Sequence, residues 1–184
     1  MTEGGDSVDV GSEETSAAQV DAAPKEASSR SRLWISVLIA AVVVVLDQVT
    51  KRWALNEFSD GHVRHLFWTL QFNLTFNSGM AFSRGQGIGP YIGAVALVVV
   101  VVLLLSLRRS GSWVSCIAVG LVVGGAVGNL VDRLFRERGW LRGRVVDFID
   151  FQWFPIFNVA DMAVTIGGVL LLLAAVMESK APRR

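Results

Sequence analysis

Four long apolar segments constrain the fold of this 184-residue chain more than any other feature of its sequence. They cover residues 33–53, 90–107, 113–134 and 159–177, and the first ends in a polar helical tip. A helix of about 20 apolar residues crosses a bilayer core, so each segment is long enough to span a membrane with modest tilt. Hydrophobic residues make up 52% of the chain, which fits the same class. The sequence therefore predicts a mainly α-helical membrane protein with four transmembrane helices.

The segments outside the spans predict a tail at each end of a single membrane domain. Residues 1–32 are acidic and rich in small polar residues without periodicity, which is typical of a disordered tail. Residues 33–178 form the membrane domain, and residues 179–184 follow as a short second tail. Four spans place both tails on one side of the membrane. Lysines and arginines are almost evenly divided between the two sides, and their positions slightly favour cytoplasmic tails.

The loop after the first span has a strand pattern of its own. From residue 66 to residue 77 the sequence LFWTLQFNLTFN alternates apolar and polar side chains with a period of two. This alternation predicts a β-strand that is half-buried or lies on a membrane surface. Because a strand needs a partner, we expect a small extramembrane β-sheet within about residues 56–83.

Polar residues at the ends of two spans are candidates for function, because burying such groups is costly. Asp47 and Lys51 are four residues apart at the end of the first span, so they share a helix face and can form an ion pair. One face at the end of the third span combines Asn129, Asp132 and Arg133 with glycines that allow close helix packing. Structural ion pairs would explain the first group and, through an Asp132–Arg133 pair, part of the second.

The stretch VVDFIDFQWFPIFNVAD, residues 145–161, contains three acids just before the fourth span. Asp147 lies between valines and a phenylalanine, and burial among them would raise its pKa. Asn158 and Asp161 fit a cap at the start of the fourth helix, where the helix N-terminus favours a charged carboxylate. Carboxyl groups in such contrasting settings suit acid/base catalysis, but local patterns alone leave Asp161 evenly divided between cap and catalyst. Asp150 is interpreted as a solvated partner of a nearby arginine, outside the chemistry.

Other classes of functional site find little support in the sequence. The single cysteine, Cys116, lies in an apolar segment, and the two histidines lack the spacing of metal ligands. There is no glycine-rich phosphate loop and no serine nucleophile elbow, and the basic residues form no long run. The sequence therefore argues against metal catalysis and against nucleic-acid binding.

Five motifs taken together resemble those of one protein family. DQVTKRWA, FNSGMAFS, GNLVDR, VVDFIDF and FNVAD occur in this order along the predicted spans, and the set is similar to that of lipoprotein signal peptidase (signal peptidase II). The resemblance covers about residues 33–178. It implies an aspartic endopeptidase of the bacterial inner membrane, with cytoplasmic termini and an active site near the outer face. It also implies that the region 56–83 is the family's extramembrane β-cradle.

The resemblance assigns roles to individual residues. Asp147 and Asp161 match the family's catalytic pair. Other matches imply residues that support the site or bind substrate: Asp47, Lys51, Asn77, Gly79, Asn129, Asp132, Arg133 and Asn158. Met80 stands where the family more often has a small residue, and the stretch between the two catalytic acids is shorter than in many members.

The resemblance also implies a substrate and a reaction. The substrates would be prolipoproteins whose cysteine already carries a diacylglyceryl group, cleaved just before that cysteine at the surface of the membrane lipids. The family uses no metal or organic cofactor, and we expect inhibition by the cyclic peptide globomycin. From their settings, we expect Asp161 to carry the resting charge and Asp147 the proton. The residues alone leave two other classes open, a small four-span transporter or channel subunit with a carboxylate relay and a structural membrane-assembly protein.

Overall fold

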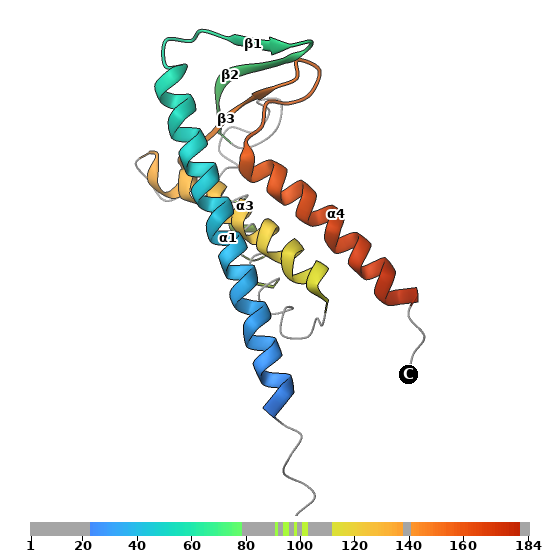
Figure 1. The fold of residues 1–184 in the computed structure, drawn as a ribbon. Helices are drawn as coiled ribbons and strands as arrows, with labels where there is room; N and C mark the ends of the chain where they lie inside the picture. Colours follow the sequence, from blue (N-terminus) through green and yellow to red (C-terminus); the bar gives the residue numbers. More distant parts are fainter. Residues whose placement is uncertain are drawn as a thin grey trace, which may run out of the picture.

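The computed structural model describes residues 23–78, 112–137 and 141–180, together with Tyr91, Ala94, Val95, Val98, Val101 and Val102. Its elements are α1 (Ala23–Glu57), β1 (Arg64–Phe67), β2 (Leu70–Asn77), α3 (Trp113–Phe135), β3 (Val145–Asp150) and α4 (Val159–Lys180). The three strands gather beyond the end of α1, at the end of the molecule where α4 begins (Figure 1). The chain therefore has a helical body with a small sheet at one end.

Three of the described helices are long and apolar enough to cross a membrane. They are Arg32–Glu57, Trp113–Phe135 and Val159–Met177, which agree with the first, third and fourth predicted spans. The second predicted span, 90–107, falls largely outside the described residues; the six positions of it that are described are helical and exposed. The protein is thus a mainly helical, multi-pass membrane protein, and the second predicted span, 90–107, stays a prediction.

Helix α1 begins at Ala23, whereas the sequence analysis extended the disordered tail to residue 32. The segment before the apolar run contains alanines, arginines, a lysine and a glutamate, which favour helix, and Pro24 is tolerated in a first turn. Because adding residues to an existing helix is much easier than starting one, the apolar helix extends into this segment. Residues 1–22 and 181–184 lie outside the described part of the chain, so the rest of the tail prediction is untested.

Helix α3 packs against both α1 and α4. The contacts are close because glycines face both neighbours. A Cβ atom on Gly124 would lie 2.7 Å from the Val43 side chain in α1, and one on Gly125 would lie 2.3 Å from the Ala160 carbonyl oxygen in α4. This confirms that the glycine-rich face of α3 allows close helix approach. The outer faces of α1 and α4 carry many exposed apolar side chains, as expected of helices in lipid.

The strand predicted over residues 66–77 is in fact a hairpin. β1 ends at Phe67, the chain turns at Trp68 and Thr69, and β2 begins at Leu70. Trp68 has a φ of 51° and is 92% exposed, so it is not part of the buried face that the alternation predicted. The paired residues beside the two-residue turn, Phe67 and Leu70, are three apart, which alone would shift a period-two pattern by one. The irregularity between His65 and Phe67 restores the phase, because His65 and its partner Gln71 are an even number of residues apart. The pattern therefore could not separate a hairpin from one longer strand.

β3 completes the sheet from outside the predicted region 56–83. The strand order is β1-β2-β3, with both pairs antiparallel, and β2 aligns with β3 so that Gln71 is opposite Asp150 and Thr75 is opposite Asp147. The sequence VVDFID does not alternate, because nearly all of its residues are buried, and a strand covered on both faces has no period-two signal. Aromatic side chains hold the sheet on the end of α1, where Trp53 makes edge contacts with Phe72 and Phe148.

Candidate active site

Asp147 and Asp161 come together where β3 meets the start of α4. The fully buried side chain of Asn158 bridges them. Its amide nitrogen donates to Asp147 Oδ1 at 2.6 Å, and its oxygen accepts from the Asp161 backbone N–H at 3.0 Å. Asn77 of β2 donates to Asp147 Oδ2 at 3.2 Å. The sheet and the first turn of α4 thus hold the two acids at one site.

The start of α4 is a reciprocal cap. Asn158 caps the backbone N–H of Asp161, and Asp161 Oδ2 accepts from the backbone N–H of Asn158 at 3.2 Å. This confirms the predicted cap. The other oxygen, Asp161 Oδ1, accepts from the amide of Asn129 in α3 at 2.8 Å. The cap therefore orients the Asp161 carboxylate, and a capping role and a chemical role are compatible.

The two acids lie in different settings, as their flanking residues predicted. Asp147 is 2% exposed, whereas Asp161 is half-buried at the N-terminus of α4. Burial raises the pKa of Asp147 and the charge of Asp161 raises it further, while hydrogen bonds from Asn158 and Asn77 oppose the rise. The resulting pKa of Asp147 is about 7. The pair can therefore share one proton near neutral pH, with Asp147 the favoured site for it.

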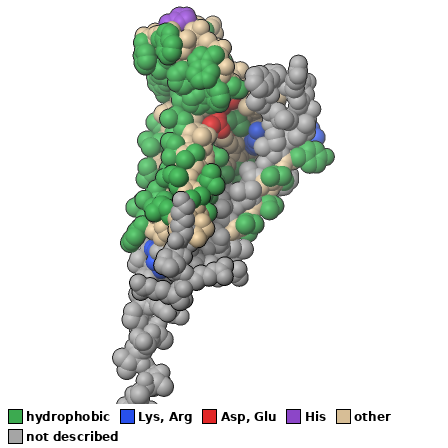
Figure 2. Space-filling view, turned by 90° about the vertical axis from the view of Figure 1, so that its right-hand side faces the viewer, with side chains coloured by type: hydrophobic (Ala, Val, Ile, Leu, Met, Phe, Trp, Pro, Cys, Tyr) green, Lys and Arg blue, Asp and Glu red, His purple; other side chains and the backbone are tan. Residues whose placement is uncertain are grey.

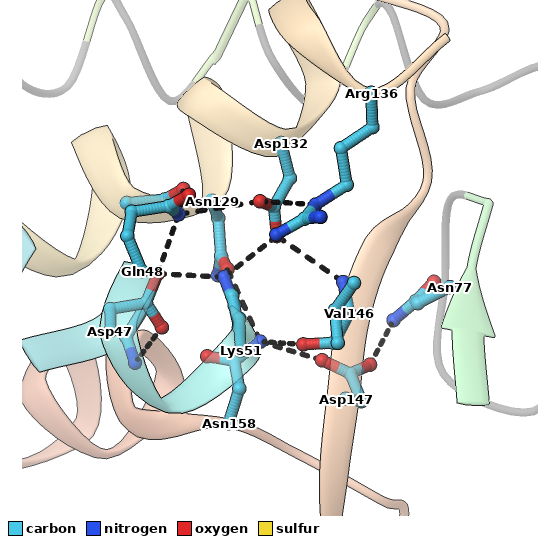
Figure 3. A network of polar contacts seen from close by, with 12 residues as sticks. Asp47, Gln48, Lys51, Asn77, Asn129, Asp132, Arg136, Val146, Asp147 and Asn158 are labelled. Carbon is cyan, nitrogen blue, oxygen red and sulfur yellow. Dashed lines mark hydrogen bonds and ion pairs between the residues drawn. The ribbon is translucent and has the colours of Figure 1, made fainter. Parts of the chain in front are cut away.

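Lys51 is the centre of the polar network behind the two acids (Figure 3). Its ammonium group is fully buried and lies 2.8 Å from Asp47 and 2.9 Å from Asp132, so the predicted Asp47–Lys51 ion pair is confirmed. The same group donates to Asn129 Oδ1 at 2.8 Å. Since the lysine occupies the amide oxygen of Asn129, the amide nitrogen is left to face Asp161. One amide therefore links the buried ion pairs to the candidate site.

The two acids that pair with Lys51 also hold backbone segments of the site. Asp132 Oδ2 accepts from the backbone N–H of Val146 at 3.2 Å, in the residue just before the acid of β3. Asp47 Oδ1 accepts from the backbone N–H of Ala160 at 3.0 Å, in the residue just before the acid of α4. Helices α1 and α3 thus position both acids of the pair through their backbones.

The ion pair with Arg133, which the sequence offered as a structural explanation for Asp132, is not the one that forms. Asp132 pairs with Lys51 and with Arg136, whose Nε lies 2.6 Å from Asp132 Oδ1. Neighbouring helix residues point about 100° apart, whereas residues four apart share a face, and this geometry favours Arg136. The acid-to-base spacing of four was visible in the sequence and could have found Arg136.

Arg133 instead lies close to the paired acids. It is 6% exposed, and its Nη1 has no hydrogen-bond partner among the described residues. Its charge interacts with Asp147, Asp132 and Asp161. A buried N–H group without a partner is costly, and one beside two acids is available to an acceptor on a bound molecule.

Gln48 is a member of the network that the sequence analysis missed. Its amide nitrogen lies 3.1 Å from Asp47 Oδ2, 3.1 Å from the Gly128 carbonyl oxygen and 3.3 Å from Asp132 Oδ1. A glutamine directly after a candidate acid at a span end was the available signal. Gly79, which the resemblance implied at a substrate groove, lies outside the described residues.

Asp150 is not the solvated partner of an arginine that the sequence suggested. It is 6% exposed and accepts hydrogen bonds from Gln71 at 2.7 Å, Asn73 at 3.1 Å and the backbone N–H of Gln152 at 2.6 Å. Burial by itself would raise the pKa of Asp150, but these hydrogen bonds outweigh it and lower the pKa. Asp150 is therefore a buried carboxylate held by uncharged donors.

Two cavities meet at Asp147. The α4-side cavity, about 530 Å³, is lined by both paired acids and by mostly apolar residues of α4 and the loop before it. The sheet-side cavity, about 660 Å³, is lined by Asp147, Asp150 and residues of β1, β2 and the loop after β3. In Figure 2, acidic side-chain atoms reach the surface just below the sheet, and most of the described side chains around them are hydrophobic. The acid pair is thus accessible from both a polar and an apolar direction.

This chain matches known proteins in both sequence and fold. The family model described as Signal peptidase (SPase) II matches residues 39–177. A lipoprotein signal peptidase from Mycolicibacterium smegmatis is 43% identical over 83% of this chain and 65% of its own length, and one from Mycobacterium avium is 41% identical over 84% and 85%. A solved structure of a bacterial membrane enzyme has a TM-score of 0.69 and 29% identity, covering 81% of this chain and 93% of that chain.

These matches agree with one another. The family model covers most of the chain, and a solved bacterial membrane enzyme has the same fold over 81% of the chain. Both relatives are described as lipoprotein signal peptidases, and each is identical to this chain at about two fifths of the aligned positions. The chain belongs to the signal peptidase II family.

Proposed function

We propose that this protein is an aspartic endopeptidase that removes the signal peptide from diacylglyceryl-modified prolipoproteins, cleaving just before the lipidated cysteine. The observation that carries the proposal is the bridging of Asp147 and Asp161 by Asn158 at a cavity beside a membrane span. Membership of the signal peptidase II family supplies the class of reaction. The two alternatives, a transporter or channel subunit and a structural membrane-assembly protein, have no comparable support.

The proposed mechanism uses one proton shared by the two acids. The ionised Asp161 takes a proton from a water molecule, whose oxygen attacks the carbonyl carbon before the lipidated cysteine. The protonated Asp147 donates its proton to the carbonyl oxygen as the tetrahedral intermediate forms. The intermediate collapses when Asp161 gives its proton to the leaving amine and Asp147 recovers a proton from the former carbonyl oxygen. The raised pKa of Asp147 supports this division of roles.

The other site residues act on this pair or on the substrate. Asn158 and Asn129 orient the two carboxyl groups, and Lys51 with its acids holds the helices that carry them. The Nη1 of Arg133, which has no hydrogen-bond partner among the described residues, suits a carbonyl oxygen of the substrate. Asn77 lines both cavities, and with Gly79 it is proposed to contact the substrate backbone.

We place the acids and the sheet near the outer face of the bacterial cell (inner) membrane, and both termini in the cytoplasm. In support, α1 leads into the sheet and α4 begins at the acids, so the start of α1 and the end of α4 lie at the other end of the molecule (Figure 1). The apolar α4-side cavity lies along a membrane span. This position would allow the acyl chains of the substrate to stay among the membrane lipids during cleavage.

A cleavage assay with matched substrates tests the function. Purified protein in detergent is mixed with a diacylglyceryl-modified prolipoprotein and, separately, with the same precursor lacking the lipid. We expect cleavage of the lipidated precursor alone, a product whose N-terminal residue is the lipidated cysteine by mass spectrometry, and inhibition by globomycin. Failure to cleave the lipidated precursor, together with ion flux into vesicles that contain the protein, would favour the transporter or channel alternative instead.

A further inference from the structure

Most of the sheet-side cavity has no role in the mechanism described above. It adjoins the α4-side cavity and shares several lining residues with it, Asp147 and Asn77 among them. Its polar lining comes from the sheet and the loop after β3, and includes His65, Gln71, Thr75 and Gln152. Phe154 lines both cavities. Any chain whose reacting bond lies at Asp147 can therefore extend in two directions that differ in polarity.

The two directions suit the two halves of the proposed substrate. A signal segment is apolar and belongs in the bilayer, which matches the α4-side cavity with its Met162 and Ile166 lining. The polypeptide after the lipidated cysteine is destined for water. The larger and more polar cavity, built from extramembrane strands, matches that half. The difference in polarity between the two cavities therefore favours the sheet-side cavity for the residues after the cleavage site.

Asp150 gives this cavity a fixed negative charge. It is buried, and the hydrogen bonds that it accepts from the described residues all come from neutral groups, the side chains of Gln71 and Asn73 and a backbone N–H. Among the described residues that line the cavity, none is a lysine or an arginine, and no described cation forms an ion pair with Asp150. A buried carboxylate without a cationic partner attracts a cation that enters the cavity and repels an anion.

The strand geometry also places this charge along a bound chain. Asp147 and Asp150 are three residues apart in β3, which corresponds to about 10 Å at the usual rise of a strand. Side chains three apart in a regular strand point to opposite faces, but both acids line the sheet-side cavity. An extended substrate that follows β3 from Asp147 would bring the third residue after the cleaved bond near Asp150. Because the cysteine is the first of these residues, that position is the second residue after the cysteine.

We propose that the sheet-side cavity is the subsite for the polypeptide after the lipidated cysteine, and that Asp150 makes it prefer a basic over an acidic side chain two residues after that cysteine. This inference rests on the proposed peptidase function. It adds a specificity determinant to the substrate, distinct from the lipid and from the signal segment.

The test compares three lipidated precursors that differ only in the second residue after the cysteine, which is lysine, glutamine or glutamate. For the wild-type protein we expect kcat/KM to fall in that order, with a lysine-to-glutamate ratio of about ten, the size of a partly solvated charge interaction. In Asp150→Asn the ratio should fall to about two. In Gln152→Glu, which adds a carboxylate to the exposed part of the lining, the ratio should rise above the wild-type value.

The control is Asp60→Asn, which removes an exposed acid from the loop after α1, outside the cavity lining. It changes the net charge equally and should leave the ratio at the wild-type value. A wild-type ratio near one, or an equal ratio in wild type and Asp150→Asn, overturns the inference. If Asp150→Asn cleaves no precursor, a Gln152→Glu ratio that does not rise overturns it. Failure of the wild-type protein on all three precursors would instead refute the peptidase function.

Discussion

The Asp147→Asn substitution is expected to make the folded protein more stable than wild type above about pH 7. Burial, and then the charge of Asp161, raise the pKa of Asp147 in the folded protein from 3.8 to about 7. Between these two values the folded state retains a proton that the unfolded chain has released. The free energy of unfolding of the wild-type protein therefore falls as the pH rises through this window. Asparagine has a similar shape and no charge, so the variant escapes this loss.

The pH dependence gives the size of the effect. One pKa unit corresponds to about 1.4 kcal/mol, so the variant should gain about 3 kcal/mol relative to wild type between pH 5 and pH 7, and little more above pH 8. Asn158 and Asn77 donate to the two oxygens of Asp147, and one of them loses its acceptor in the variant. That loss costs about 1 kcal/mol at every pH. The growth of the difference with pH therefore separates the effect of the carboxyl group from this constant cost.

Thermal unfolding in detergent micelles, followed by tryptophan fluorescence from pH 5 to pH 8, measures the effect. A gain of about 3 kcal/mol should widen the difference in Tm by roughly 6–12 °C. Glu137→Gln removes an exposed carboxylate whose ion-pair partner is Arg144 rather than a histidine, and it is the control, for which the Tm difference from wild type should stay constant over this range. A difference for Asp147→Asn that stays constant, or that narrows as the pH rises, would refute the burial and coupling argued for this acid.

Three further predictions concern activity and packing. Because Asp147 must be protonated to donate to the carbonyl oxygen, kcat should fall as the pH rises through about 7. Initial rates from pH 5.5 to pH 9 measure this dependence, and a kcat that stays constant over the range would contradict the role of Asp147. Lys51→Met leaves two buried carboxylates without their shared cation and should lower the free energy of unfolding by about 3–5 kcal/mol, whereas the exposed neighbour Arg52→Met should change Tm little. Gly125→Ala forces a Cβ atom into the α4 backbone and should lower the free energy of unfolding by about 1–3 kcal/mol or more. Gly168→Ala is the control, because a Cβ atom there has nothing within 4 Å, and it should not lower Tm. Equal Tm values for the two alanine variants would contradict the close helix contact.

The helical part of the fold was largely predictable from the sequence, because apolar length is a direct signal for a membrane span. The three described spanning helices start and end within a few residues of the predicted bounds, apart from the early start of α1. The sheet was only half predictable. The alternation over residues 66–77 indicated strand but concealed the turn at Trp68, and β3 has no alternation because it is covered on both faces.

Spacing along a helix predicted contacts within one element, and contacts between elements had no such signal. Asp47 with Lys51, and Asn158 with Asp161, were found because four-residue and capping spacings are local rules. The link from Lys51 through Asn129 to Asp161 joins three helices, and no local pattern encodes it. The same limit explains the error at Asp150, whose donors Gln71 and Asn73 lie in another strand.

Cleavage of a lipidated precursor by the acid-pair variants tests the central claim most directly. Asp147→Asn and Asp161→Asn are each purified in parallel with wild type, and folding is checked by the thermal unfolding signal. The account predicts that wild type releases the signal peptide from a diacylglyceryl-modified prolipoprotein, and that each folded variant leaves the precursor intact over the same time. Substantial processing by either folded variant would contradict the assignment of Asp147 and Asp161 as the catalytic pair.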